Sequence, residues 1–169
     1  MRLTILALAA ASLGACTGVV ERPVVSRVGS AESPIAVSVA VPAGMELVYV
    51  SGSVPDVANP AAPAGSVERF GDTETQTRSV LNKLDAALAA RGLSLADAVM
   101  MRVFLVAPPG QQRMDFAGMM RAYRERFATA AQPNKPARST MQVSGLVDPG
   151  WLVEIEVTAA HHPQGRASQ

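Results

Sequence analysis

The sequence predicts a two-layer α+β domain, in which one mixed sheet carries two helices on the same face. Five short segments have the composition of strands and two longer ones have helical periodicity, in the order ββαβαββ. Hydrophobic residues make up 49% of the 169 residues, which is enough for a packed core. Because two helices cover only one face of such a sheet, we expect a closed oligomer to cover the other face.

The first fifteen residues have the pattern of an export signal. Arg2 precedes an apolar stretch of about ten residues, which is shorter than the roughly 20 that span a bilayer. The run that follows, Leu13-Gly14-Ala15-Cys16, resembles the signal of bacterial lipoproteins, in which small residues precede a cysteine that is lipidated and becomes the new N-terminus. The alternative is a plain secretory signal with an incidental cysteine.

The lipoprotein resemblance implies a location. A lipidated Cys16 would hold the protein on a membrane in the periplasm of a Gram-negative bacterium through its acyl chains alone. Thr17, rather than an aspartate, follows the cysteine. In the lipoprotein pattern this favours the outer membrane.

Four parts are expected along the chain. They are a signal peptide (1–15), a lipidated cysteine with a flexible tether (16–34), one domain (35–160) and an exposed tail (161–169). Residues 17–34 are assigned to the tether because they mix Val, Pro, Ser, Gly and charged residues without periodicity.

Charge and composition exclude nucleic acid as a partner. Arg2 is the only charged residue in the signal, so the formal net charge falls from +1 to zero when the signal is removed. Aromatic residues make up only 4% of the chain. A neutral chain with few stacking side chains offers neither the electrostatic attraction nor the platforms that nucleic acids require.

The first two strands are predicted to form a hairpin. Residues 35–41 alternate loosely and are rich in β-branched side chains, Pro42-Ala43-Gly44 signals a turn, and residues 47–52 have the composition of a second strand. A loop rich in Pro, Ala and Gly follows over residues 55–70.

Two amphipathic helices are predicted. The first is capped by Asp72 or Thr73 and ends at Gly92, after which residues 94–97 resemble a capped single turn. Its apolar stripe consists of Val80, Leu81, Leu84, Ala87 and Leu88. The second helix lies within residues 113–128, and its apolar side chains are Phe116, Met119, Met120, Tyr123 and Phe127.

Three further strands complete the sheet. Residues 99–106 are apolar except for Arg102, which predicts a central strand covered on both faces. Residues 138–143 and 151–160 are the other two strand candidates.

The common cofactor and hydrolase motifs are missing from the sequence. It contains no GxGxxG, Walker, GxSxG or HExxH pattern. One cysteine and the adjacent His161 and His162, which are expected in the tail, cannot form a structural zinc site. We therefore expect no metal and no organic cofactor.

Three segments are similar to the YjgF/RidA family of reactive-intermediate deaminases. They are Val50-Ser51-Gly52-Ser53-Val54-Pro55, Pro136-Ala137-Arg138-Ser139-Thr140 and Val153-Glu154-Ile155-Glu156. The resemblance extends over residues 35–160. It implies a chorismate-mutase-like fold and a homotrimer with active sites in clefts between subunits. It also implies the hydrolysis of 2-imino acids, or their enamine tautomers, to 2-oxo acids and ammonia.

Arg138 and Glu154 are the expected catalytic residues. A guanidinium binds a carboxylate bidentately, so Arg138 would hold a 2-imino acid with its C=N carbon placed for attack by water. The resemblance implies that Glu154 orients or activates that water. Strand alternation places Glu154 and Glu156 on one face, with Glu156 as a structural or surface carboxylate. The alternatives are a surface arginine and a solvated edge strand.

The resemblance also places Ser51, Gly52 and Thr140 in the pocket, where they would bind substrate. Thr140 shares a strand face with Arg138 but has no base to make it a nucleophile. Two positions depart from the family. Ser38 stands where many members have tyrosine, and Met120 stands where asparagine is common.

The sequence leaves two other functions open. One is a non-catalytic envelope protein that binds small carboxylates or a protein partner, which the two departures and the anchor favour. The other is a ribonuclease, an activity that has been attached to the family. The neutral charge, few aromatic residues and a domain without histidine argue against it.

Overall fold

The structure is a computed structural model that describes residues 23–163. The predicted signal, Cys16 and the first residues of the predicted tether lie outside the described residues, as do residues 164–169.

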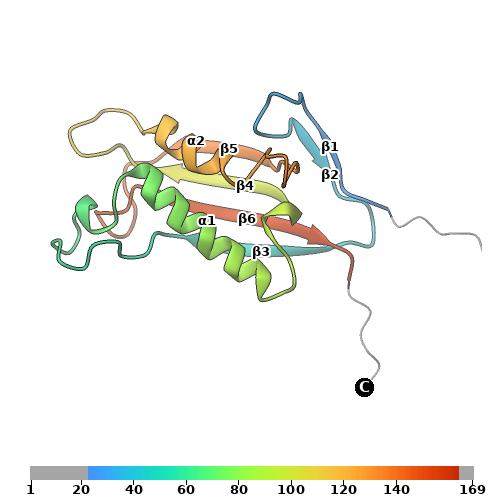
Figure 1. The fold of residues 1–169 in the computed structure, drawn as a ribbon, viewed down its shortest axis with the longest axis horizontal. Coiled ribbons are helices and arrows are strands. Elements are labelled where there is room, and N and C mark those ends of the chain that lie inside the picture. The colour runs from blue at the N-terminus through green and yellow to red at the C-terminus, as the bar shows by residue number, and fades with distance from the viewer. Residues whose placement is uncertain (1–22, 164–169) are drawn as a thin grey trace, which may run out of the picture.

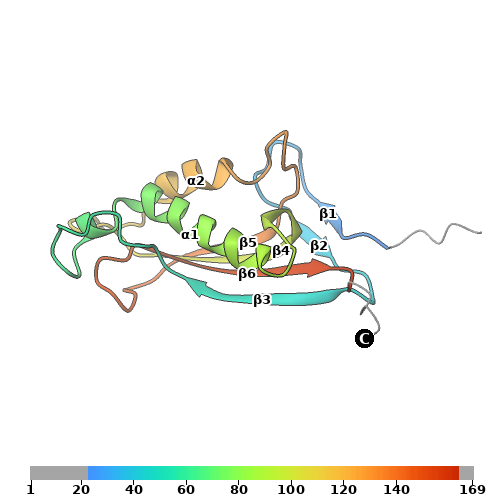
Figure 2. The same cartoon turned by 60° about the horizontal axis from the view of Figure 1, so that its bottom comes forward.

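One mixed four-stranded sheet forms the first layer of the domain (Figure 1). Its order is β3 (Glu46–Ser53), β6 (Val153–His161), β4 (Ala98–Leu105) and β5 (Ala137–Gln142). β6 pairs antiparallel with both β3 and β4, and β5 pairs parallel with β4. Helices α1 (Thr73–Ala89) and α2 (Phe116–Arg124) lie together on one side of this sheet (Figure 2). The predicted two-layer fold is confirmed, and the homotrimer stays a prediction.

The predicted first hairpin is wrong. β2 (Ser38–Ala40) pairs with β1 (Ser26–Val28) in a separate two-stranded sheet, and β3 pairs with β6 instead. Just before β2, Ala36 forms a parallel bridge with Ala137 at the start of β5. The segment before β3 therefore reaches the opposite edge of the main sheet.

Residues 23–34, which the sequence assigned to the tether, lie against the domain. The Nη2 atom of Arg27 donates to the carbonyls of Ala96 and Ala98 at 3.3 and 3.2 Å. Lys135 donates to the carbonyls of Ser30 and Ser33 at 2.8 and 2.9 Å. Hydrogen bonds to main-chain oxygens therefore hold this segment against the domain. Such bonds need no periodic apolar pattern in the sequence.

Helix α1 begins and ends as predicted. The side chain of Asp72 accepts a hydrogen bond from the Thr75 N–H, which caps the N-terminus. At the C-terminus Gly92 has a φ of 72°, and the N–H of Leu93 bonds to the carbonyl of Leu88. This is a Schellman ending, for which glycine is the favoured residue.

The other helical segments are short. α2 has nine residues and is capped by Asp115, so it is shorter than the predicted range. The predicted capped turn is present as a 3-10 helix, η2 (Leu95–Asp97), with Ser94 in a capping box. A second 3-10 helix, η1 (Val67–Arg69), lies in the loop before α1.

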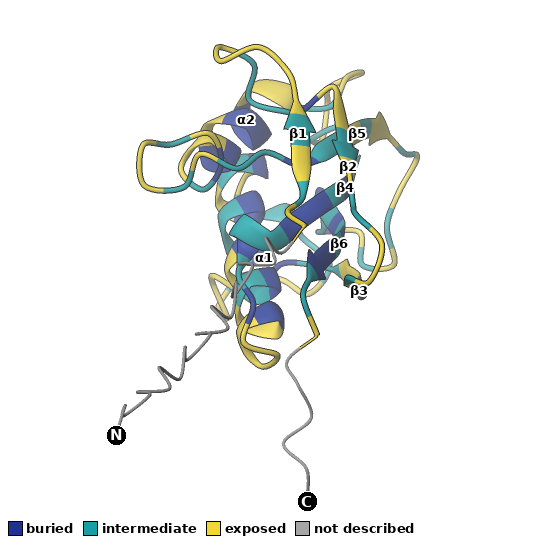
Figure 3. Cartoon of the chain, turned by 90° about the vertical axis from the view of Figure 1, so that its right-hand side faces the viewer, coloured by how far each residue is buried: buried dark blue, intermediate teal, exposed yellow. Residues whose placement is uncertain are grey.

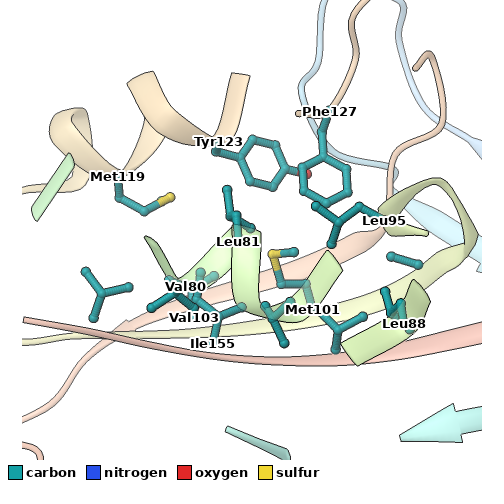
Figure 4. Close-up of a cluster of buried hydrophobic side chains, with 14 of the residues drawn as sticks. Val80, Leu81, Leu88, Leu95, Met101, Val103, Met119, Tyr123, Phe127 and Ile155 are labelled. Atoms are coloured by element: carbon teal, nitrogen blue, oxygen red, sulfur yellow. The ribbon is translucent and has the colours of Figure 1, made fainter. Parts of the chain in front are cut away.

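The core lies between the helices and the sheet. Figure 4 shows side chains of α1 and α2 over Met101, Val103 and Ile155 of the central strands. The rings of Tyr123 and Phe127 stack with centroids 4.5 Å apart. The predicted stripes of the two helices supply eight residues of this cluster, although Ala87 and Phe116 of those stripes are exposed, and the buried residues in Figure 3 gather in the same layer.

The opposite face of the sheet is open in the single chain. Arg102 is exposed there and Phe104 is only half-buried, so β4 is not covered on both faces as predicted. Tyr49 on the same face is 75% exposed. The helices are too few to cover a second face.

The last strand begins two residues later and ends one residue later than predicted, because it spans Val153–His161 and not residues 151–160. His161 is its final residue, not the start of a tail, and lies 3.6 Å from the Glu46 carboxylate. Across the described residues, no helix is long and apolar enough to cross a membrane.

Candidate functional site

Arg138 points toward the helix layer from the outer strand β5. It is opposite Met101 in the parallel ladder, and Met101 is fully buried under the helices. Its guanidinium carbon lies 4.3 Å from the ring centroid of Tyr123 and 5.8 Å from that of Phe116. Its Nη2 atom donates to the sulfur of Met120 at 3.2 Å. Side chains of α2 therefore hold the guanidinium, through the bond to Met120 and a cation–π contact with Tyr123.

No acidic side chain among residues 23–163 pairs with Arg138. Its Nη1 atom is buried without a hydrogen-bond partner in this part of the chain. Burial lowers the pKa of this guanidinium, since desolvation disfavours the cation. The Oγ1 atom of Thr140, on the same strand face, is likewise buried without a described partner. Such unsatisfied groups are rare in cores and are expected where a ligand or water binds.

The arginine faces a hollow of about 560 Å³. One wall is formed by α2, and the other by the segment that leads into β2. The lining residues are Ser33, Pro34, Ile35, Phe116, Ala117, Met120, Arg121, Arg124 and Arg138. A mainly apolar concave surface with a few convergent cations suits a small anion that carries an apolar part.

Tyr123 forms the platform beneath the guanidinium. Burial raises the pKa of its hydroxyl to about 12, so the phenol is neutral at physiological pH. The hydroxyl donates to the carbonyl of Pro34 at 3.1 Å, which joins α2 to the segment before β2. Tyr123 therefore positions Arg138 and cannot serve as a base near neutral pH.

Glu154 lies on the other face of the sheet. It is opposite Phe104, whereas Val153 and Ile155 point into the core, as alternation predicted. Its carboxyl group occupies the space beside Gly52. A Cβ added at Gly52 would lie 2.9 Å from Cδ of Glu154 and closer still to Oε1. The missing side chain of Gly52 thus makes room for this carboxylate.

Ser51 lines a second, smaller hollow of about 200 Å³ on the open face. Arg102 and Glu156 form an ion pair of 3.2 Å at the same place. Glu156 is therefore a paired surface carboxylate, as expected. Glu154, in contrast, has no ion pair or side-chain hydrogen bond with the rest of the described chain.

The structure separates the predicted site residues into two groups. Gly52 and Glu154 lie together on the open face, which Ser51 shares, and Arg138 and Thr140 lie together on the helix face. β4 stands between β5 and β6, so the groups are about 10 Å apart across the sheet and on opposite sides of it. One copy of the chain does not bring Arg138 and Glu154 to a single site.

Sequence reasoning missed several parts of the hollow. It assigned Phe116 and Tyr123 only to the helix stripe, and it gave Arg124 no role. The spacing of Phe116, Met120 and Tyr123 on one helix face was visible, but the strand that this face covers was not. Within the described residues, no group of three or more His, Cys, Asp or Glu side chains could hold a metal ion.

Fold and site define a two-layer α+β protein with a concave, arginine-lined candidate site for a small anion. The chain belongs to the family described as endoribonuclease L-PSP, which includes the YjgF, RutC and Rid proteins; the family model matches residues 31–161.

Two curated relatives match this chain, and the name of the first gives the RutC family. The chain is 39% identical over 89 residues to a RutC family protein of Pyrococcus horikoshii, covering 53% of this chain and 63% of that protein. It is 34% identical over 126 residues to protein DfrA of Myxococcus xanthus, covering 75% of this chain and 84% of that protein.

Solved structures show the same fold. A Yersinia pestis protein of unknown function from the Rid family, YyfB, is 26% identical, with a TM-score of 0.56 and coverage of 76% of this chain and 87% of that chain. E. coli TdcF with bound serine is also 26% identical, with a TM-score of 0.52 and coverage of 80% of this chain and 98% of that chain.

Proposed function

We propose that this protein is a hydrolytic deaminase that converts reactive 2-imino acids, or their enamine tautomers, to 2-oxo acids and ammonia in the cell envelope. The observation that carries the proposal is Arg138. Its guanidinium is partly buried, has an unsatisfied Nη1 atom and faces a hollow of about 560 Å³. A carboxylate is the ligand that such a fork binds best.

The reaction needs only water. The water oxygen bonds to the imine carbon as one water proton passes to the nitrogen, which gives a carbinolamine. The hydroxyl proton of the carbinolamine then passes to the amine, the C–N bond breaks as the C=O bond forms, and ammonia leaves. Arg138 holds the neighbouring carboxylate and so fixes the imine carbon. Glu154 accepts the proton of the attacking water and returns it to the leaving amine. No electron is transferred, and we propose that no metal or organic cofactor takes part.

The active site in this proposal is completed between two copies of the chain. Arg138 and Thr140 come from the helix face of one copy, and Ser51, Gly52 and Glu154 come from the open face of its neighbour. Two observations support this arrangement. The two groups lie on opposite faces in one copy, and the open face exposes Leu47, Tyr49 and Met141, which association would bury. We propose the homotrimer that the family resemblance implies.

The bound serine in the structure of TdcF gives the proposal independent support. Serine has a carboxylate next to a carbon that bears nitrogen, and a 2-imino acid has the same arrangement. A related protein of this fold thus takes a ligand of the required chemistry.

The test uses Arg138→Gln. Imines generated by an amino-acid oxidase are trapped as semicarbazones, and a deaminase slows that trapping. We expect kcat/KM to fall roughly 100- to 1000-fold, because a charge-assisted bidentate contact and the positioning that it provides are both lost. Arg91→Gln removes an exposed arginine elsewhere and should leave activity unchanged. Unchanged activity in the folded Arg138→Gln variant would refute the mechanism.

A mixing experiment tests the shared site. Arg138→Gln and Glu154→Gln are each expected to be inactive. After unfolding together and refolding in equal amounts, about a quarter of the sites should combine an intact Arg138 with an intact Glu154. Recovery of about a quarter of wild-type activity supports a site between copies. No recovery, with mixed oligomers present, would place both residues in one copy.

A non-catalytic envelope protein that binds carboxylates remains the second candidate. The specific observation in its favour is that Met120 contacts Arg138 where many relatives have asparagine. It would be supported if the wild-type protein bound 2-oxo acids through Arg138 but did not slow semicarbazone formation for any imine tried.

The envelope location is a separate part of the proposal. It depends on export and lipidation at Cys16. Mass spectrometry of the protein from membranes should show acyl chains on an N-terminal Cys16. Cys16→Ser should move the protein to the soluble fraction.

A further inference from the structure

Arg124 is a second cation at the hollow that faces Arg138. It is the last residue of α2, its side chain lines the hollow, and it forms no ion pair or side-chain hydrogen bond with the described chain. The third arginine there, Arg121, is different. Its Nε atom lies 2.5 Å from the carboxylate of Glu74, so its charge is already balanced.

The hollow thus presents two unbalanced positive charges on a mainly apolar surface. Burial is the main cause that lowers the pKa of Arg138, Tyr123 opposes it, and the positive charge of Arg124 makes a smaller contribution in the lowering direction. The partial negative charge at the C-terminus of α2 stabilises the positive charge of Arg124. This interaction does not explain why the side chain lines the hollow. A ligand with one carboxylate would balance only one of the two charges.

We infer that the substrates are 2-imino dicarboxylic acids, the imines of acidic amino acids. This inference rests on the proposed function. Arg138 binds the carboxylate next to the imine carbon, and Arg124 binds the distal carboxylate. The hollow of about 560 Å³ accommodates a chain of four or five carbons, and Phe116 and Met120 contact its methylene groups. The chemistry at the imine carbon is unchanged, with water added and ammonia released.

The selectivity follows from the charges. The distal carboxylate of a dicarboxylic acid would form an ion pair with Arg124. A monocarboxylic acid of equal length has no group that could do so. Because hydrogen bonds between charged groups are among the strong ones, we expect the dicarboxylate to bind about 10- to 100-fold more tightly.

Calorimetry with stable 2-oxo acids tests the inference without depending on catalysis. The probes are 2-oxoglutarate and 2-oxopentanoate, which have the same chain length and differ at the distal group. We expect Arg124→Gln to reduce 2-oxoglutarate binding to the level of 2-oxopentanoate. The matched control is Arg91→Gln, since Arg91 is also an exposed arginine near the C-terminal end of a helix and should keep the wild-type preference.

Two results would overturn the inference. One is equal affinity of the wild-type protein for the two acids, and the other is an undiminished preference in Arg124→Gln. Turnover then separates this inference from the proposed function. If imines of neutral amino acids are hydrolysed with no preference for acidic ones, the deaminase assignment stands and the role of Arg124 is refuted. If 2-oxoglutarate binds preferentially through Arg124 but no imine is hydrolysed, the charge recognition stands and the deaminase assignment fails.

Discussion

Replacing Gly52 with alanine should displace the carboxylate of Glu154 without unfolding the domain. A Cβ at this position meets the Glu154 carboxyl group, 2.9 Å from Cδ and closer to Oε1. The carboxylate must therefore move by at least about 1 Å to restore ordinary contacts. It is the far end of a flexible side chain, half-buried on the open face, so it can move at little cost. We expect the free energy of unfolding to change by less than about 1 kcal/mol.

The effect on turnover should be much larger than the effect on stability. A displacement of about 1 Å in a positioned catalytic group can cost about 100-fold in rate. We expect Gly52→Ala to lower kcat toward the value of Glu154→Gln while KM changes little, because carboxylate binding depends on Arg138. The matched control is Gly145→Ala, at a glycine where an added Cβ meets nothing within 4 Å.

Deamination is measured by competition with semicarbazide for the imine. The free energy of unfolding is measured in parallel with urea. The proposed role of Gly52 is to leave room for the Glu154 carboxylate. It would be refuted if Gly52→Ala kept the wild-type kcat while Glu154→Gln lost activity. A drop of several kcal/mol in stability would show instead that residue 52 is a packing position.

Three further perturbations test individual parts of the structure. Gln76→Leu should cost about 3 kcal/mol in urea unfolding, because the buried amide bonds to three main-chain groups that would lose their partner. Asp72→Asn keeps the cap but removes a carboxylate whose pKa is lowered chiefly by the Thr75 N–H. The contribution of that charge, about 0.5 kcal/mol, should be present at pH 7 and lost as the pH falls from about 4 through the lowered pKa of the folded state, so the stability difference between the two proteins should shrink in that range. Tyr123→Phe should lose about 1 kcal/mol with its bond to the carbonyl of Pro34 yet keep 2-oxo acid binding. The wild-type pH–rate profile should show no tyrosine limb near pH 10, because that pKa is about 12.

Periodicity predicted the elements that bury a regular apolar face. α1 carries a stripe of which all residues except Ala87 pack into the core, and its two ends have caps that follow local rules. The alternation of Val153, Glu154 and Ile155 likewise placed the glutamate opposite the core. These predictions succeeded because each depends on contacts that repeat within a few residues.

The N-terminal segment could not be predicted in this way. β1 has three residues and no apolar face, and it is held by bonds from Arg27 to carbonyls about 70 residues away. Ala36 bridges to Ala137 of β5, which is even further away along the chain. Nothing local distinguishes such a segment from a flexible tether, so the sequence also gave the wrong partner for β2.

For a related reason, the sequence did not show on which face of the sheet Arg138 lies. β5 reads ARSTMQ, in which the two apolar residues, Ala137 and Met141, lie on the open face, so alternation shows that Arg138 and Thr140 share a face but not that this face lies under the helices. The parallel register with β4 decides this, because it sets Arg138 beside Met101 under α2. The sequence could therefore select Arg138 and Glu154 without showing that they lie on opposite sides of the sheet.

The residue at position 120 connects this geometry with the choice of substrate. An asparagine there would offer both a donor and an acceptor to a ligand at Arg138, whereas the thioether of Met120 is only a weak acceptor and already takes a bond from the guanidinium. Ser38, the other departure, lies in β2 and is exposed. With no amide at position 120, recognition in this hollow depends mainly on charge and apolar contact. Arg124 and Arg138 have no acidic partner among the described residues, so they are the features most able to discriminate between substrates. The charge at the distal end of the substrate should therefore matter more here than its hydrogen-bonding groups.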